Sequence, residues 1–170
     1  TAYLAPVSEI PQVRSRVAAV LAAAGVVPDS HAAKSLQSIL DVYPRDELFQ
    51  SDTATLYDTA MRIFLIQERR KIRLFIRTDR RNRFASCLVY WPRDIYRTEL
   101  RQKIESLLMD ALGAAESEFT TFFSESVLVR TYFVMRLGEH ARTDYDAEEL
   151  EALIVRIAQQ WQDQLGTALV

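Results

Sequence analysis

Apolar residues recur at the spacing of a helix through the first third of the chain. The first series predicts a helix that begins at Ser8, its N-cap, and ends at Gly25. The second series predicts a helix that begins after a cap at Asp29-Ser30 and is stopped by Pro44. A third helix is expected to follow Asp52, which can cap it. In chain order, the apolar stripes are Val13, Val17, Val20, Leu21 and Ala24, then Leu36 and Leu40, then Leu56, Ala60, Ile63 and Phe64.

After Arg69 the apolar period shortens from about 3.6 residues, typical of a helix, to about 2, typical of a strand. Over 72–76 the alternate apolar residues are expected to point to one face of this strand and the basic residues to the other. A turn over 78–83 and a second strand over 83–91, nearly continuous in apolar residues, would complete a hairpin.

The rest of the chain predicts a helix, two strands and a last helix. Thr98 can cap the first of these helices, which Gly113 closes. The strands are expected over 118–124 and 127–137, and the last helix opens with a capping box at 146–149. The buried positions of the two helices are expected to be Leu100, Ile104, Leu107, Leu108 and Ala111, and then Leu150, Leu153, Ile154, Ile157, Trp161 and Leu165.

From Asp52 onward the predicted order is α-β-β-α-β-β-α, which favours an antiparallel sheet with helices on one face. This order contains the core of a ferredoxin-like fold plus an extra strand and helix. We therefore predict an α+β, ferredoxin-like fold preceded by N-terminal helices. The expected domains are a helical segment over 1–50 and an α+β domain over 51–170.

The length of 170 residues suits one domain, or one small domain with an appended helical piece. Apolar residues make up 49% of the chain, which is enough for a sizeable core. No apolar run has transmembrane length, so no membrane is expected as a partner. Cys87 is the single cysteine; it excludes an internal disulfide and favours a reducing, cytoplasmic compartment. The chain begins with Thr1 rather than Met, so we expect a segment of a longer protein.

Residues that carry catalysis are scarce. Four glycines leave no room for a phosphate-binding loop or a dinucleotide fingerprint. His31 and His140 have no cysteine, second histidine or paired carboxylate at ligand spacing, which argues against a metal site. We predict no catalytic, cofactor-binding or metal-binding residues in this chain.

Positive charge is concentrated in the predicted hairpin, although the whole chain has a formal net charge of -2. Three interpretations stay open: a solvated sheet face, an interface with another domain or subunit, and a surface for single-stranded RNA. The missing glycine-containing RNA motif and the negative net charge make nucleic acid the least favoured partner. In the interface hypothesis the first strand lies beside the last, and the candidate effector or interface residues are Arg73, Phe75, Arg77, Arg130, Tyr132 and Arg136.

Two short segments are interpreted as structural corners. In each, a proline ends one element, and charged or apolar side chains can then fix the bend. Asp46 is expected to cap the short helical turn over 46–49. The corner residues are Tyr43, Pro44, Arg45, Asp46 and Phe49 in the first segment, and Pro92, Arg93 and Asp94 in the second.

Four segments resemble the long N-terminal region of large bacterial NAD-specific glutamate dehydrogenases. Their order and spacing agree over roughly residues 40–137, and several matches in order are more specific than any one of them. The segments are Tyr43-Pro-Arg-Asp-Glu-Leu-Phe-Gln50, Gln67-Glu-Arg-Arg-Lys-Ile-Arg-Leu-Phe75, Arg83-Phe-Ala-Ser-Cys-Leu-Val-Tyr-Trp-Pro-Arg-Asp94 and Ser124-Glu-Ser-Val-Leu-Val-Arg130.

The resemblance implies that this chain is an ACT-like regulatory domain of an enzyme that oxidises glutamate to 2-oxoglutarate with NAD. It implies contacts with other domains and subunits, a homo-oligomer, and an amino-acid effector as a further partner. Amino-acid-binding ACT domains generally carry a glycine-containing turn after their first strand, and this chain has none. Two hypotheses follow: a module that builds the oligomer, or a ligand sensor that could also act by itself.

Overall fold

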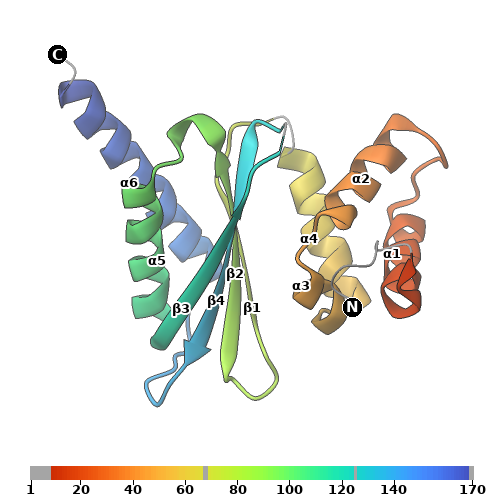
Figure 1. Ribbon diagram of the computed structural model, residues 1–170, viewed down its shortest axis with the longest axis horizontal. Coiled ribbons are helices and arrows are strands. Elements are labelled where there is room, and N and C mark those ends of the chain that lie inside the picture. The colour runs from red at the N-terminus through yellow and green to blue at the C-terminus, as the bar shows by residue number, and fades with distance from the viewer. Residues whose placement is uncertain (1–8, 67–68, 125, 169–170) are drawn as a thin grey trace. The chain divides into compact units, whose positions relative to one another are not determined.

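The computed structural model describes residues 9–66, 69–124 and 126–168 (Figure 1). The chain divides into two compact units, residues 1–67 and 68–170. Sequence analysis placed the first domain over residues 1–50, whereas helix α4, Thr53–Ile66, lies in the first unit and packs with helices of that unit. In the described part, no helix is both long and apolar enough to cross a membrane.

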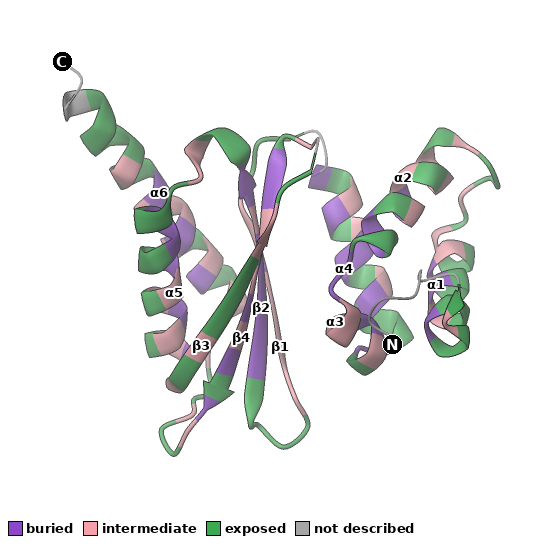
Figure 2. Ribbon diagram, viewed as in Figure 1, coloured by how far each residue is buried: buried purple, intermediate pink, exposed green. Residues whose placement is uncertain are grey.

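The first unit is helical, with α1 at Pro11–Ala24, α2 at His31–Asp41, α3 at Arg45–Gln50 and α4 at Thr53–Ile66. Helix α4 packs against both α1 and α2, and α1 packs against α3. The apolar stripes of the sequence face the interior of this unit, as Figure 2 shows. Its buried apolar residues include Val13, Val17, Val20, Leu36, Leu40, Leu48, Leu56, Ala60 and Ile63.

The helix ends carry most of the expected caps. Gly25 closes α1 in the left-handed conformation at φ 64°, where its N–H bonds the carbonyl of Ala22. Ser30 accepts a 3.1 Å hydrogen bond from the N–H of Ala33 at the start of α2. Asp52 accepts one of 2.7 Å from Thr55, and this bond holds the pKa of Asp52 below its usual range. The cap predicted at Ser8 lies outside the described residues.

Helix α3 differs from the prediction at its start. Pro44 occupies the N-cap position, and Asp46 lies inside the first turn, so the expected cap by Asp46 is wrong. Proline fixes φ near the helical value and lacks an N–H, which suits it to begin a helix. From within that turn, the negative charge of Asp46 still interacts favourably with the positive end of the helix dipole.

The second unit contains a four-stranded sheet and two long helices. The strands are β1 at Arg73–Thr78, β2 at Phe84–Pro92, β3 at Ala114–Phe122 and β4 at Leu128–Leu137. Their order across the sheet is β1-β2-β4-β3, and every neighbouring pair is antiparallel. A short 3-10 turn, η2 at Arg93–Ile95, follows β2, and the helices are α5 at Thr98–Leu112 and α6 at Ala147–Ala168.

This arrangement is an α+β, ferredoxin-like fold, as predicted. Strands β2 and β3 are joined through α5, and β4 lies between them, which is the split β-α-β arrangement of that fold. The strand beside β2 comes from the N-terminal side of the unit rather than from its end. The order is therefore a permuted form of the ferredoxin-like one. That fold also has four strands, so no strand of this sheet is additional to it.

Helices α5 and α6 cover one face of the sheet and share a core with it (Figures 1 and 2). At the centre of this core the fully buried Trp91 donates a 3.1 Å hydrogen bond from Nε1 to Oγ1 of Thr131, which is also fully buried. This bond satisfies both polar groups inside an apolar layer. The buried apolar residues include Leu74, Ala85, Cys87, Val89, Leu100, Ile104, Leu108, Leu112, Val129, Phe133, Met135 and Ile154.

Several predicted boundaries and orientations are corrected. Strand β3 begins at Ala114, four residues earlier than expected, because Gly113 turns the chain directly from α5 into the sheet. Arg97, not Thr98, is the N-cap of α5. Leu107 is half-buried against the core, and Leu165 on α6 is 40% exposed rather than buried.

We predict that Ile154→Ala lowers the free energy of unfolding by roughly 2–5 kcal/mol, because the side chain is fully buried between α6 and the sheet. The matched control is Leu165→Ala on the exposed part of the same helix, which should cost less than about 1 kcal/mol. Urea unfolding followed by circular dichroism measures both. Equal losses for the two variants would contradict this placement of the helix.

Candidate functional site

The six candidate residues of the basic hairpin and the last strand share one face of the sheet. Side chains alternate between the two faces along each strand, and Leu74, Cys87 and Phe133 lie on the face that the helices cover. On each strand, the residues at the intervening positions therefore point away from α5 and α6. The register forms two rows on that face, which run across the strands as Arg73, Tyr90, Arg130 and Phe122, and as Phe75, Leu88, Tyr132 and Thr120.

The expectation that the first strand lies beside the last is wrong. Strand β2 lies between β1 and β4, so the two groups of candidate residues are separated by two strand spacings, about 10 Å. Tyr90 and Leu88 occupy the gap between them. The rings of Phe75 and Tyr90 meet edge to face, with centroids 6.2 Å apart. The face thus combines arginines with aromatic residues, but β2 supplies its centre.

Arg73 is bound to a carboxylate from α6. Its Nη1 lies 2.9 Å from Oε1 of Glu151, and Oε2 of the same carboxylate accepts a 2.9 Å hydrogen bond from the backbone N–H of Leu74. Glu151 therefore balances the arginine charge and also satisfies a backbone donor of β1. Sequence analysis missed Glu151, because nothing in the helix pattern indicates which surface carboxylate faces the edge of a sheet.

Arg136 and Glu116 form a two-point ion pair between β4 and β3. Nη2 and Nε of the arginine donate to the two carboxylate oxygens at 2.7 and 3.2 Å. These bonds and the charge of Arg136 hold the pKa of Glu116 below its usual range. The pair is exposed, so it contributes little to stability and mainly fixes the position of both side chains.

Arg130 lies among aromatic rings. Its guanidinium carbon is 4.9 Å from the ring centroid of Phe122, within the range of a cation–π contact. Burial raises the pKa of Tyr90 to about 12, and the neighbouring positive charge of Arg130 and its hydrogen bond act in the opposite direction. Arg77 and Tyr132 are half-buried and also engaged in interactions.

Positive charge in the hairpin is therefore partly balanced inside the unit. Besides the pair between Arg73 and Glu151, Arg70 binds Asp94, and Arg83 lies 3.8 Å from Asp79. A ligand carboxylate at Arg73 or Arg136 must compete with a resident carboxylate. The same pairs reduce the attraction for a polyanion, which argues further against nucleic acid.

Asp79 organises the turn of the hairpin. Its Oδ1 accepts hydrogen bonds from the N–H groups of Arg83 at 2.6 Å and Phe84 at 2.9 Å. The bond from Phe84 is the largest cause that holds the pKa of Asp79 below its usual range. Asn82 adopts the left-handed conformation at φ 53°, which asparagine tolerates better than most residues. The predicted turn thus depends on one carboxylate.

The second corner joins the end of β2 to the hairpin between β3 and β4. The N–H of Arg93 donates to the carbonyl of Val127 at 2.8 Å, and its guanidinium donates to the carbonyl of Ser124 at 2.6 Å. Asp94 binds Arg70 rather than the backbone. Arg93 confirms the expectation that this motif bonds the backbone at the bend.

The first corner is held by an arginine that sequence analysis missed. Nη1 of Arg16 on α1 donates to the carbonyls of Leu48 and Ser51 at 2.8 Å each, and also to that of Phe49. These carbonyls belong to the end of α3, where a cation is favourable. Tyr43 and Pro44 are buried, whereas Arg45, Asp46 and Phe49 are half-buried.

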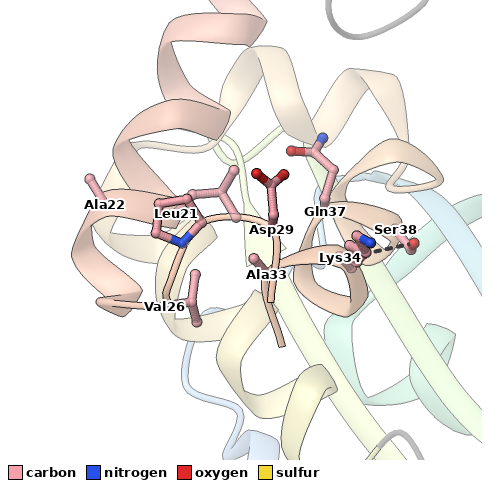
Figure 3. Close-up of a pocket in the computed structure, with 9 residues that line it drawn as sticks. Leu21, Ala22, Val26, Asp29, Ala33, Lys34, Gln37 and Ser38 are labelled. Atoms are coloured by element: carbon pink, nitrogen blue, oxygen red, sulfur yellow. Dashed lines mark hydrogen bonds between the residues drawn. The ribbon is translucent and has the colours of Figure 1, made fainter. Parts of the chain in front are cut away.

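The described part of the chain includes two open hollows. The first, of about 570 Å³, has Leu21 and Val26 on one side and Lys34 on the other, with Asp29 between them (Figure 3). The second, of about 520 Å³, is lined by Arg73, Glu151 and apolar residues of α6 and the β2 end. In the first, the hydroxyl of Ser38 donates a 2.9 Å hydrogen bond to the backbone carbonyl of Lys34. No cluster of three metal-binding side chains occurs among the described residues.

We predict that Asp79→Asn destabilises the protein at pH 7 and that the loss shrinks below about pH 4. A carboxylate with a lowered pKa stabilises the fold above its unfolded pKa, and this contribution disappears as pH falls through the folded pKa. Urea unfolding at pH 7 and pH 2.5 measures the difference.

Arg83→Gln is the matched variant for the Asp79 experiment. Backbone hydrogen bonds, not the charge of Arg83, dominate the pKa shift of Asp79. Most of the pH dependence should therefore remain in Arg83→Gln. An Asp79→Asn loss of equal size at both pH values would contradict this role of the carboxylate.

Comparison with known proteins supports the division into a helical part and a sheet part. Residues 10–69 match the family described as glutamate dehydrogenase, helical motif 1, and residues 73–162 match glutamate dehydrogenase, ACT2 domain. The chain is 44% identical over 168 residues to the NAD-specific glutamate dehydrogenase of Pseudomonas aeruginosa, which covers 99% of this chain and 10% of that protein.

Two further relatives carry the same name. Identity is 43% over 170 residues with the Halomonas elongata protein and 35% over 173 residues with the Mycobacterium tuberculosis protein. These alignments cover 100% and 95% of this chain but only 10% and 11% of the relatives. The chain thus spans about a tenth of the length of the relatives that it matches. It belongs to the family of glutamate dehydrogenase ACT2 domains, with a helical motif preceding that domain.

Proposed function

We propose that this chain is a non-catalytic regulatory and oligomerisation part of a cytoplasmic, NAD-dependent glutamate dehydrogenase. That parent enzyme would convert L-glutamate, NAD⁺ and water into 2-oxoglutarate, ammonium, NADH and a proton. The proposal is supported by the family and by relatives that are named NAD-specific glutamate dehydrogenases over the full length of this chain. NAD would bind elsewhere in the parent enzyme.

The observation that carries the proposal is the sheet face that bears Arg73, Phe75, Arg130 and Tyr132. Arginine and aromatic side chains are enriched at protein interfaces, where their large contact areas contribute most of the binding energy. Glu151 already pairs with Arg73, and Glu116 pairs with Arg136 of the same face. Such a preorganised surface suits contacts with another domain or protomer.

The second candidate function is an amino-acid sensor, and Arg77 with Arg130 is the observation that favours it. Planar guanidinium groups suit two-point capture of a carboxylate. The two arginines lie on strands separated by β2, so one ligand carboxylate would not reach both without rearrangement. An effector would therefore bind where a second surface completes the site.

We predict that replacing Phe75 and Tyr132 together with Ser weakens assembly of the full-length enzyme. The two rings lie in one row of the sheet face and would lose their contact with a partner surface. Leu65→Ser, an apolar residue on α4 that is 65% exposed, is the control. Sedimentation velocity measures assembly, and circular dichroism of the chain checks that the double variant folds. Unchanged assembly would indicate a solvated face.

We predict that glutamate, aspartate and leucine show no saturable binding to this chain as a monomer. The resident carboxylates occupy Arg73 and Arg136, and a partner surface would have to complete any site. Calorimetry against this chain and against the full-length enzyme, with Arg77→Ala as the comparison variant, tests it. Tight binding to the monomeric chain that Arg77→Ala abolishes would contradict the requirement for a partner surface.

A further inference from the structure

The hollow of about 520 Å³ beside β1 and α6 is lined by residues of the second unit alone. Near the start of β1, the N–H of Leu74 bonds Glu151 of α6. At the end of β1, Thr78 contacts Tyr145, which precedes α6. The strand and the helix therefore run in opposite directions. Residues 70–72, which precede β1, lie beside the later turns of α6 and form one wall of the hollow there.

The floor of this hollow is aliphatic. Pro92 and Ala158 are buried at its base, and the half-buried residues of the floor are Ile72, Ile95 and Val155. No aromatic ring is among the described residues that line it. Sites for small molecules combine such an apolar surface with a few polar groups that fix the orientation of the ligand. An aliphatic chain is the body that this floor fits, because each CH₂ group removed from water there is favourable.

Positive charge lies at one end of the floor, where Arg70 and Lys71 line the hollow. Gln159 and Gln162 of α6 add side-chain amides, which can donate hydrogen bonds to an anion. Arg70 binds Asp94, but the two side chains are 61% and 58% exposed, so this ion pair is weak. Among the described residues, no carboxylate lies within ion-pair distance of Lys71. This end of the hollow can therefore bind an anionic head group.

A carboxylate lies at the other end of the floor. Glu151 is 22% exposed, and its two oxygens are bound by Arg73 and by the N–H of Leu74 at 2.9 Å each. Gln159 follows Glu151 by eight residues, which is about 12 Å along the axis of α6. A second carboxylate at the far end of a ligand would have to compete with Glu151 for Arg73. The methyl end of an aliphatic chain would not.

We propose that this hollow binds a straight-chain aliphatic monocarboxylate. Its carboxylate lies at Arg70 and Lys71, and its chain follows the floor toward Glu151. The lining residues carry three positive charges and one negative charge, so the hollow favours an anion. The floor selects against anions without an apolar body, and Glu151 selects against a second charge at the far end. Glutamate and 2-oxoglutarate therefore fit poorly. The site needs no second domain or copy, so it goes beyond the proposed oligomerisation role.

Chain length tests the floor, and a second carboxylate tests its far end. Butyrate, hexanoate, octanoate and octanedioate are titrated into the 170-residue chain by isothermal calorimetry. Each added CH₂ group should tighten binding about fourfold until the chain outgrows the floor. Octanedioate should bind about tenfold more weakly than octanoate. The proposal is overturned if octanoate shows no saturable binding up to about 10 mM, or if butyrate or octanedioate binds as tightly as octanoate.

Two matched pairs of variants test the location. Lys71→Gln should weaken octanoate binding about fivefold, whereas Lys34→Gln, an exposed lysine of α2, should leave it unchanged. Val155→Asp places a carboxylate in the floor and should abolish binding. Ala152→Asp adds the same charge at an exposed position of α6 that does not line the hollow. Circular dichroism checks each fold. Equal effects within either pair would contradict the site, and the lysine pair decides if Val155→Asp does not fold.

Amide chemical shifts distinguish this hollow from other apolar surface. In heteronuclear NMR spectra of the labelled chain, octanoate should shift the amide signals of Ile95, Val155 and Gln159 most. Phe119 on β3 is 45% exposed and represents the apolar surface outside the hollow. Largest shifts at Phe119 would overturn the proposal, because they would indicate adsorption to exposed apolar residues. Assembly of the full-length enzyme is a separate measurement, so failure of this site leaves the proposed oligomerisation role to be judged on its own.

Discussion

The buried layer between the two central strands and the two helices determines the rest of the α+β unit. Trp91 and Phe133 are the largest side chains in that layer, and both are fully buried. Side chains of a strand alternate between the two faces. Because Trp91 and Phe133 point into the core, the residues next to each of them along the strand must point outward. A slip by one residue would bury arginines and expose the apolar core. The register of the sheet is therefore strongly specified by burial.

The outward face follows from that constraint rather than from any attraction between its own residues. Arg73 and Arg130 enter one row because β1 and β4 both flank β2 in a fixed register. Exposed ion pairs such as the one between Arg136 and Glu116 typically add less than about 1 kcal/mol to stability. They reduce the freedom of long side chains instead. These ion pairs therefore order the side chains on the outward face and reduce its net positive charge.

The sequence was sufficient to predict the elements and their faces where apolar spacing is regular. The change of period after Arg69, the turn at Asp79 and the αL glycine at Gly113 all have local causes, so each could be found without a structure. The family resemblance was confirmed in the same stretch. Local patterns predicted the helix starts less well. Arg97 and Pro44 are the N-caps of α5 and α3, where Thr98 and Asp46 were expected.

Strand order and long-range polar contacts could not be predicted from local patterns. A ferredoxin-like order can be permuted without changing any one helix or strand, so β2 between β1 and β4 left no mark in the sequence. Arg16 and Glu151 have the composition of ordinary helix surfaces. Their partners lie 32 to 35 and 77 to 78 residues away and become neighbours only after the chain has folded.

Glu151 also shows why charge and strand pairing cannot be separated in this unit. One carboxylate oxygen binds Arg73 and the other binds the backbone of β1, so both bonds depend on the same residue of α6. A ligand that displaced Glu151 from Arg73 would disturb the contact that protects this edge. Any effector at Arg73 would thus change the exposure of the β1 edge as well as the local charge. A ligand shifts a conformational equilibrium only through contacts that differ between the conformations of the protein.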